Sequence, residues 1–189
     1  MSAGERAAGE HGQSTTDLWA QLSAEELREF LRSAAKLWLA HDGLWFQAVE
    51  ARFGMEAAMA CDRDAWARFS PIEARRIRQH LDLPAEGGLA ALERALRYRL
   101  YSHLNRQSSE RPDAETLVFR MESCRVQDAR QRKGLPDFPC REVGIVEYST
   151  FASAIDPRIE TRCRHCPPDP RTAKSVCSWE FRLREKDAS

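Results

Sequence analysis

The chain has 189 residues, which suits one domain that can bury a hydrophobic core without disulfides. Its 29 lysines and arginines balance its 29 aspartates and glutamates, and no basic block is present, which argues against a general nucleic-acid binder. No apolar run approaches the about 20 residues that span a bilayer, and residues 1–16 lack the apolar stretch of a signal peptide. We therefore expect a disordered leader over 1–16, no membrane partner and a cytoplasmic protein whose thiols stay reduced.

Helix signals open the first half of the chain. Ser23 and Glu26 match a capping box, in which each side chain bonds the backbone N–H of the other residue. Apolar residues then recur at helical spacing, starting at Leu27. Gly43 is a candidate break in this helix, and Gly54 is a candidate stop.

Three further helices are expected before the middle of the chain. The first covers 56–68. A new start signal follows at 70–73, with Ser at the cap, Pro at the first position and Glu at the third, and this helix should end near residue 81. After a glycine-containing loop at 84–88, the last helix of this half is expected over 89–104.

The pattern changes in the second half. The polar stretch 105–114 contains a proline and predicts a connection. Strands are expected over 116–123, 159–164 and 175–183, and helices over 124–133 and 140–155. The last two strands are separated by a short loop and should pair antiparallel.

These elements predict an α+β fold, in which a helical N-terminal half packs on a small antiparallel sheet with two helices in the C-terminal half. We expect a single domain over 17–189, with a helical part at 17–105 and a cysteine-rich sheet part at 116–184.

Five of the six cysteines lie in the sheet part. Cys163 and Cys166 form a C-x-x-C pair at the end of one predicted strand, and Cys177 lies near the start of its partner strand. Three thiols at one end of a hairpin are typical of a zinc knuckle. Candidates for the fourth ligand are Cys140, Cys124 and His165.

Two other interpretations of the cysteines remain open. An iron–sulfur cluster uses the same ligands and is the alternative cofactor. Cysteine is also a small residue that is often buried for packing alone, which is the interpretation we prefer for Cys61, on a helix among alanines.

Cys124 and Cys140 also fit a catalytic role, since each lies at the predicted start of a helix. The helix N-terminus and neighbouring arginines favour a thiolate, which could act as a nucleophile. Glu147 and Asp156 are the candidate acid and base beside them. The simpler alternatives are a solvated helix face for Glu147 and a turn cap for Asp156.

Five residues are candidates for substrate binding. His41 and Asp42 form a polar pair in an apolar helical stretch, and with Trp45 they could line a pocket. The aromatic residues nearby could wall an apolar or planar ligand, although such residues are more often core. A local basic patch that includes Arg125 and Arg130 could hold a small anion.

Several motifs resemble those of a known family. They are the segments 121–135, 138–140, 147–148, 155–158 and 163–169, together with His41-Asp-Gly-Leu-Trp-Phe46. Over about residues 23–184 the chain resembles a family of small uncharacterised cytosolic proteins of bacteria and archaea. That family is distantly similar to L-2-amino-thiazoline-4-carboxylate hydrolases and, more remotely, to vinyl-reductase-like ligand-binding domains. The resemblance implies an α+β build and opening of a small ring or an amide-like C–N bond.

The sequence therefore favours an enzyme that acts on a small molecule, as a hydrolase or a C–N bond-cleaving enzyme, through Cys thiolates or a Cys-bound metal. One alternative is a zinc-containing ligand-binding or sensing module without catalysis, and another is an iron–sulfur redox protein. The expected partner is a small-molecule substrate or ligand, and a homodimer is left open. No P-loop, dinucleotide-binding motif or nucleophile elbow is present.

Overall fold

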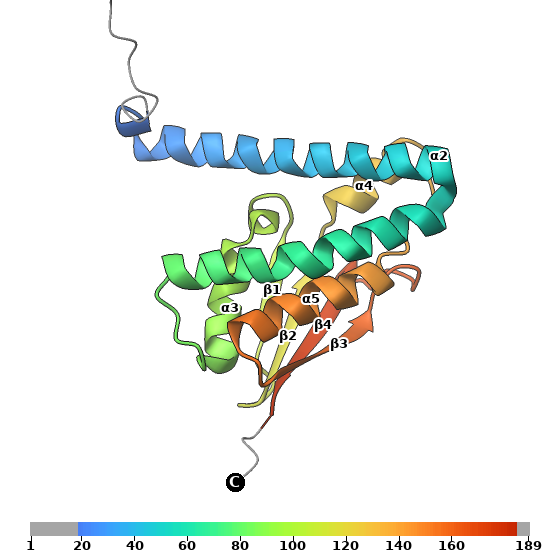
Figure 1. Cartoon of the computed structure of the whole chain (residues 1–189). Helices are drawn as coiled ribbons and strands as arrows, with labels where there is room; N and C mark the ends of the chain where they lie inside the picture. The colour runs from blue at the N-terminus through green and yellow to red at the C-terminus, as the bar shows by residue number, and fades with distance from the viewer. Residues whose placement is uncertain (1–18, 185–189) are drawn as a thin grey trace, which may run out of the picture.

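The computed structural model describes residues 19–184, so the predicted leader lies outside the described residues (Figure 1). The fold is α+β, with a helical N-terminal half packed on an antiparallel sheet and two helices, α4 and α5, in the C-terminal half. The elements are α2 (Ala24–His80), α3 (Gly88–Tyr98), the 3-10 helix η1 (Leu100–His103), β1 (Gln107–Glu110), β2 (Thr116–Met121), α4 (Arg125–Arg132), α5 (Arg141–Ile155), β3 (Ile159–His165) and β4 (Cys177–Leu183).

Helix α2 begins at the predicted capping box. The Glu26 carboxylate accepts from the Ser23 N–H at 2.8 Å, and the Glu26 N–H donates to Ser23 Oγ at 3.3 Å. Gly54 has φ 86° and ψ 170°, so the predicted stop is a sharp kink inside α2. The kink divides α2 into a first arm (24–53) and a second arm (55–80), which fold back as a helical hairpin (Figure 1).

Three expectations for α2 are wrong. Gly43 does not break the first arm, and Pro71 lies inside the second arm instead of starting a new helix. A proline in a helix removes one backbone hydrogen bond, but the second arm packs along α5, with Ser70 and Ala74 fully buried beside it, and this packing overrides the local signal. Cys61, expected in the core, is exposed, because it lies on the outer face of the second arm.

The last helix of the N-terminal half is also shorter than predicted. Helix α3 ends at Tyr98 because Arg99 is extended, with φ −65° and ψ 148°, and the chain continues as the 3-10 helix η1. At its start, Gly88 has φ 58°, and its N–H donates to Asp156 Oδ2 at 2.9 Å. A left-handed φ of this kind favours glycine.

The sheet has the strand order β1-β2-β4-β3, and all neighbouring strands are antiparallel. The predicted pairing of the last two strands is confirmed, with Cys163 opposite Trp179. Strand β1 lies in the stretch predicted as a connection. Its sequence, Gln-Ser-Ser-Glu, carries no apolar alternation, and it is an edge strand held by pairing with β2.

Helix α5 lies between the second arm and the sheet, and its inner face forms the centre of the core (Figure 1). Fully buried core side chains include Leu92, Leu96, Leu117, Phe151, Ile155, Trp179 and Phe181. The first arm is different, since many of its apolar side chains are exposed. Leu37 is 69% exposed and Trp45 63% exposed.

Two contacts attach the far end of the first arm to α4. Arg130 donates to both carboxylate oxygens of Glu50, at 2.8 and 3.0 Å, and Lys133 donates to Gln47 Oε1 at 2.7 Å. The first arm and α4 therefore lie on two sides of the same cavity, which is described below. Across residues 19–184, none of the helices is both long and apolar enough to cross a bilayer.

Candidate functional site

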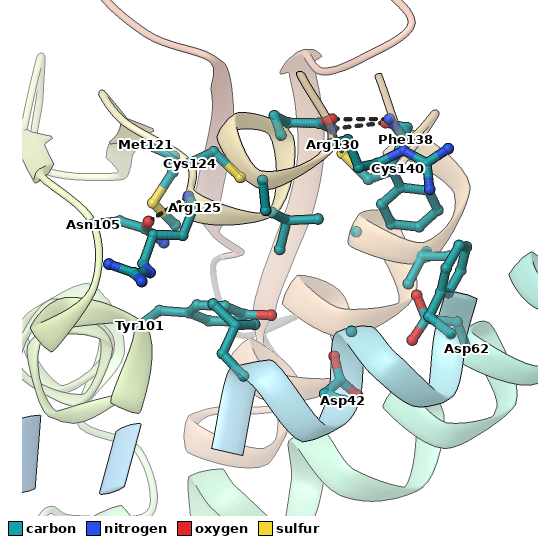
Figure 2. A pocket seen from close by; sticks show the side chains of 18 of the residues that line it. Asp42, Asp62, Tyr101, Asn105, Met121, Cys124, Arg125, Arg130, Phe138 and Cys140 are labelled. Atoms are coloured by element: carbon teal, nitrogen blue, oxygen red, sulfur yellow. Dashed lines mark hydrogen bonds between the residues drawn. The ribbon is translucent and has the colours of Figure 1, made fainter. Parts of the chain in front are cut away.

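A cavity of about 380 Å³ lies between the two arms of α2 and the C-terminal half. Side chains from η1, β2, α4, α5 and β4 complete its walls (Figure 2). Aromatic rings line much of it, including Phe46 and Phe138, whose ring centroids are 4.8 Å apart. Such a mostly apolar space with a few polar groups is typical of a small-molecule site.

Two carboxyl groups enter the cavity from α2, and we call them the acid pair (Asp42 and Asp62). Asp42 belongs to the first arm and Asp62 to the second, and the kink at Gly54 brings both to one side of the cavity (Figure 2). Burial raises the pKa of Asp42. Burial, together with the negative charges of Asp42 and Glu147, raises the pKa of Asp62 to about 7.

A buried triad of charged side chains (Arg99, Glu73 and Glu147) borders the cavity through Glu147. The Arg99 guanidinium pairs with Glu147 Oε1 at 2.7 Å and with Glu73 Oε2 at 2.9 Å, and the Arg99 side chain is only 2% exposed. It also lies over the rings of Trp66, Tyr101, Tyr148 and Phe151, at 4.7–5.7 Å from their centroids. Glu147, a predicted acid or base, therefore lines the cavity but is engaged by Arg99.

Tyr101 and Cys124 face the acid pair from other sides of the cavity (Figure 2). Cys124 precedes α4, as predicted, and its side chain makes no capping hydrogen bond. Burial raises the pKa of the Cys124 thiol to about 12. Desolvation thus outweighs the helix N-terminus, and Cys124 is held as a neutral thiol instead of the expected thiolate.

The structure brings together the three cysteines of the predicted zinc knuckle and Cys140, one of the three candidates for the fourth ligand. We call them the thiol cluster (Cys140, Cys163, Cys166 and Cys177). Cys140 Sγ and Cys166 Sγ are 3.4 Å apart, and the Cys166 side chain also interacts with those of Cys163 and Cys177. Cys140, Cys166 and Cys177 line the cavity as well. His165, another ligand candidate, instead contacts the Ser175 carbonyl oxygen at 3.3 Å.

In the thiol cluster the other three thiols contact Cys166, and the four sulfurs do not surround one common point. Within the described part of the chain, no group of three or more His, Cys, Asp or Glu side chains is already arranged to hold a metal ion. Contacts with the other three thiols raise the pKa of Cys166. The pKa of Cys163 is lowered, because Cys163 has a hydrogen bond with Cys166 and lies near the positive charge of Arg141.

The remaining predicted residues divide into those at the cavity and those elsewhere. Arg125 and Arg130 line the cavity, although Arg130 is paired with Glu50. His41 and Trp45 are exposed on the first arm, next to the lining residues but outside them. Asp156 follows α5 and is fully buried against the start of α3, where its ion pair with Arg158, at 2.7 Å, lowers its pKa.

Sequence reasoning missed Asp62 and Tyr101. An aspartate inside a helix has low helix propensity, and Asp62 lies four residues before Trp66, the one local sign that its side chain is not simply solvated. Its approach to Asp42 depends on the angle of the kink at Gly54, which no local pattern gives.

Of the comparisons with known proteins, only the one with protein-family models gives a match. No curated protein and no solved structure matches the chain, so the similarity to thiazoline-carboxylate hydrolases and vinyl-reductase-like domains gains no support. Residues 20–183, which include every element from α2 to β4, match one family model. The chain belongs to the family of unknown function DUF6125.

Proposed function

We propose that this protein is an enzyme that acts on a small molecule inside the cavity, with the acid pair as its general acid and base. One observation carries the proposal. The carboxyl group of Asp62 shares a mostly apolar cavity with Asp42 and has a pKa of about 7. Strongly shifted carboxyl groups in a cavity are a recurrent property of active sites.

The acid pair has the properties that acid–base catalysis needs near neutral pH. A general base works best when its pKa is close to the working pH, and a carboxyl at about 7 meets that condition. Two like charges in one cavity oppose simultaneous ionisation, so one group carries a proton while the other is a carboxylate. The pair thus holds one acid and one base at the same time.

Hydrolysis of a C–N bond fits this pair. The carboxylate takes a proton from a water molecule as its oxygen attacks the carbon, and the carboxyl gives its proton to the departing nitrogen as the C–N bond breaks. Segments such as 163–169 resemble a family of uncharacterised proteins, and the proposed reaction class rests only on the distant similarity of that family to thiazoline-carboxylate hydrolases, which the comparisons do not support. A cavity of about 380 Å³ suits a small heterocycle or amide.

The cysteines have a weaker claim to the chemistry. The neutral Cys124 thiol is a poor nucleophile, because the reactive form is the thiolate. Cys140 lies in the thiol cluster, 3.4 Å from Cys166 Sγ, and accepts from Gln127 Nε2 at 3.6 Å. These contacts occupy its sulfur and favour a structural role.

A substrate panel with matched variants tests the proposal. Wild-type protein is incubated with 2-aminothiazoline-4-carboxylate, lactams, cyclic amidines and simple amides, and products are measured by mass spectrometry. For any substrate turned over, we expect Asp62→Asn to lower kcat/KM by about 100-fold or more, the usual contribution of a general base. Asp64→Asn is the control, because Asp64 is exposed on the same arm. Full activity in Asp62→Asn would refute the role of the acid pair.

A ligand-binding module without catalysis is the second candidate, favoured by the aromatic walls of the cavity. It is the function that the resemblance to vinyl-reductase-like domains implies. Calorimetry on the same panel separates the two functions. Tight binding of a compound that is never converted, with equal affinity in wild type and Asp62→Asn, supports the module and opposes the enzyme.

A further inference from the structure

The thiol cluster is assembled from three separate parts of the chain. Cys140 precedes α5, Cys163 and Cys166 lie at the end of β3, and Cys177 is the first residue of β4. Strands β3 and β4 pair antiparallel with an irregularity between Cys163 and His165, which re-aims the end of β3. The backbone of Arg141 joins the same region, since its N–H donates to the Pro167 carbonyl oxygen at 3.1 Å.

We propose that the thiol cluster binds one zinc ion through all four sulfurs, as a structural site. The proposal is independent of the reaction assigned to the acid pair. Structural zinc sites are tetrahedral and four thiolates are one of their common ligand sets, in which Zn–S bonds of about 2.3 Å place neighbouring sulfurs about 3.8 Å apart. The 3.4 Å between Cys140 Sγ and Cys166 Sγ is close to that separation.

Closing the site would move the four sulfurs from their contacts with Cys166 to one common centre. The Cys163 and Cys177 side chains already interact with Cys166, and Cys163 is half-buried. The short distance between Cys140 and Cys166 fits two thiolates on the same metal ion, whereas a [4Fe–4S] cluster binds each of its four thiolates to a separate iron.

The surroundings of the thiol cluster suit a negatively charged centre. Four thiolates and one Zn²⁺ carry a net charge of about −2. Arg141 lies beside Cys163, where its guanidinium also pairs with Asp169, and its buried Nε has no hydrogen-bond partner among the described residues. Gln127 Nε2 donates to Cys140 Sγ at 3.6 Å. Such N–H donors to the ligand atoms are a regular part of metal sites.

The site would add a further link to a loop that is held so far by backbone hydrogen bonds and ion pairs, such as the bond from Val176 N–H to the Met121 carbonyl oxygen at 2.8 Å. Residues 166–176, between β3 and β4, form no helix or strand, and Cys166 and Cys177 lie at its two ends. Binding would fix this loop to the start of α5 and so set one wall of the cavity. Four protein ligands leave no open position, so the metal would not carry a reacting water.

Metal analysis of the full chain tests the proposal. The protein is purified under reducing conditions from zinc-supplemented cells, and zinc and iron are measured by inductively coupled plasma mass spectrometry. We expect one zinc per chain in wild type and loss of that zinc in Cys163→Ser and Cys166→Ser. Cys163 is half-buried, so its variant should fold, which circular dichroism checks. Cys61→Ser, at an exposed cysteine outside the cluster, should keep its zinc.

Reconstitution with Co²⁺ gives a second readout that needs no variant. Wild-type protein stripped of metal and loaded with Co²⁺ should show intense thiolate-to-cobalt charge-transfer absorption and the visible bands of a tetrahedral ion. Three results would overturn the proposal: no zinc and no cobalt spectrum in reduced wild type, full zinc retention in Cys163→Ser, or stoichiometric iron with inorganic sulfide. None of these results changes the case for the acid pair, because Asp42 and Asp62 lie on α2 outside the cluster.

Discussion

The two sides of the cavity use polar groups in opposite ways. On the α2 side, Asp42 and Asp62 come from two arms of one helix, and burial raises the pKa of both carboxyls. On the sheet side, the sulfurs of the thiol cluster contact one another, with Cys140 and Cys166 3.4 Å apart. Groups that are buried without a counterion are poised for proton transfer, whereas groups that satisfy one another stabilise structure. This difference is the reason why we propose a catalytic role for the acid pair and a structural role for the thiol cluster.

The largest effect is expected where the two sides are joined. Arg99 links Glu73 of α2 to Glu147 of α5, and Arg99→Met would leave two buried carboxylates without a cation. We expect the free energy of unfolding to fall by about 3–5 kcal/mol in urea denaturation.

Arg97→Met is the matched control for this change. Arg97 pairs with Glu93 at 2.8 Å on the exposed face of α3, and such a pair contributes about 0.3–0.5 kcal/mol. Equal losses in the two variants would show that the buried triad does not hold the two sides together.

A smaller effect is expected from Gly144→Ala, on the sheet side. A Cβ atom at Gly144 would lie 2.7 Å from Cζ2 of Trp179, which is 1% exposed, so the ring has to shift. Overpacking of this kind costs about 1–3 kcal/mol. Gly43→Ala, on the α2 side, meets nothing closer than 3.9 Å and should gain up to about 1 kcal/mol. Thermal unfolding of both variants checks the contrast, and a stable Gly144→Ala protein would argue against the tight packing of α5 on β4.

The smallest effect concerns the pH dependence of stability. Because the folded pKa of Asp62, about 7, lies above the ordinary aspartate value of 3.8, its contribution to stability is fully present below pH 3.8 and is lost as the pH rises through 7. Asp62→Asn removes this loss. Relative to wild type, the free energy of unfolding of the variant should therefore rise by about 1–2 kcal/mol between pH 4 and 8. The gain is smaller than the full pKa difference implies, because solvent screens the charge of the partly exposed Asp62. Urea denaturation across that pH range measures the gain, and a difference that does not change with pH would contradict it.

Much of the sheet side could be predicted from the sequence, because its signals are local. The C-x-x-C pair at Cys163 and Cys166 and the thiol at Cys177 flank one hairpin, so their proximity follows from antiparallel pairing. The capping box at Ser23 was equally local, and it forms as predicted.

The α2 side could not be predicted in the same way. Asp42 and Asp62 meet only because α2 kinks at Gly54, and the helix continues through Pro71 only because it packs on α5. The charges on Glu147 and Asp156 suggested chemistry, but their arginine partners, Arg99 and Arg158, are not deducible from sequence spacing alone. The burial of the first arm could not be predicted either. Its apolar residues follow helical spacing, which correctly predicts a helix, but many of these side chains are exposed.

The central claim is that Asp62 titrates near neutral pH in the resting protein. Carbon-13 NMR of protein labelled at the aspartate carboxyl carbons, with Asp62 assigned from the spectrum of Asp62→Asn, measures this pKa without any substrate. We predict a midpoint of about 7 for Asp62, which moves down in Asp42→Asn because a negative neighbour is removed. A midpoint at the ordinary value of an exposed aspartate, unchanged in Asp42→Asn, would contradict the account.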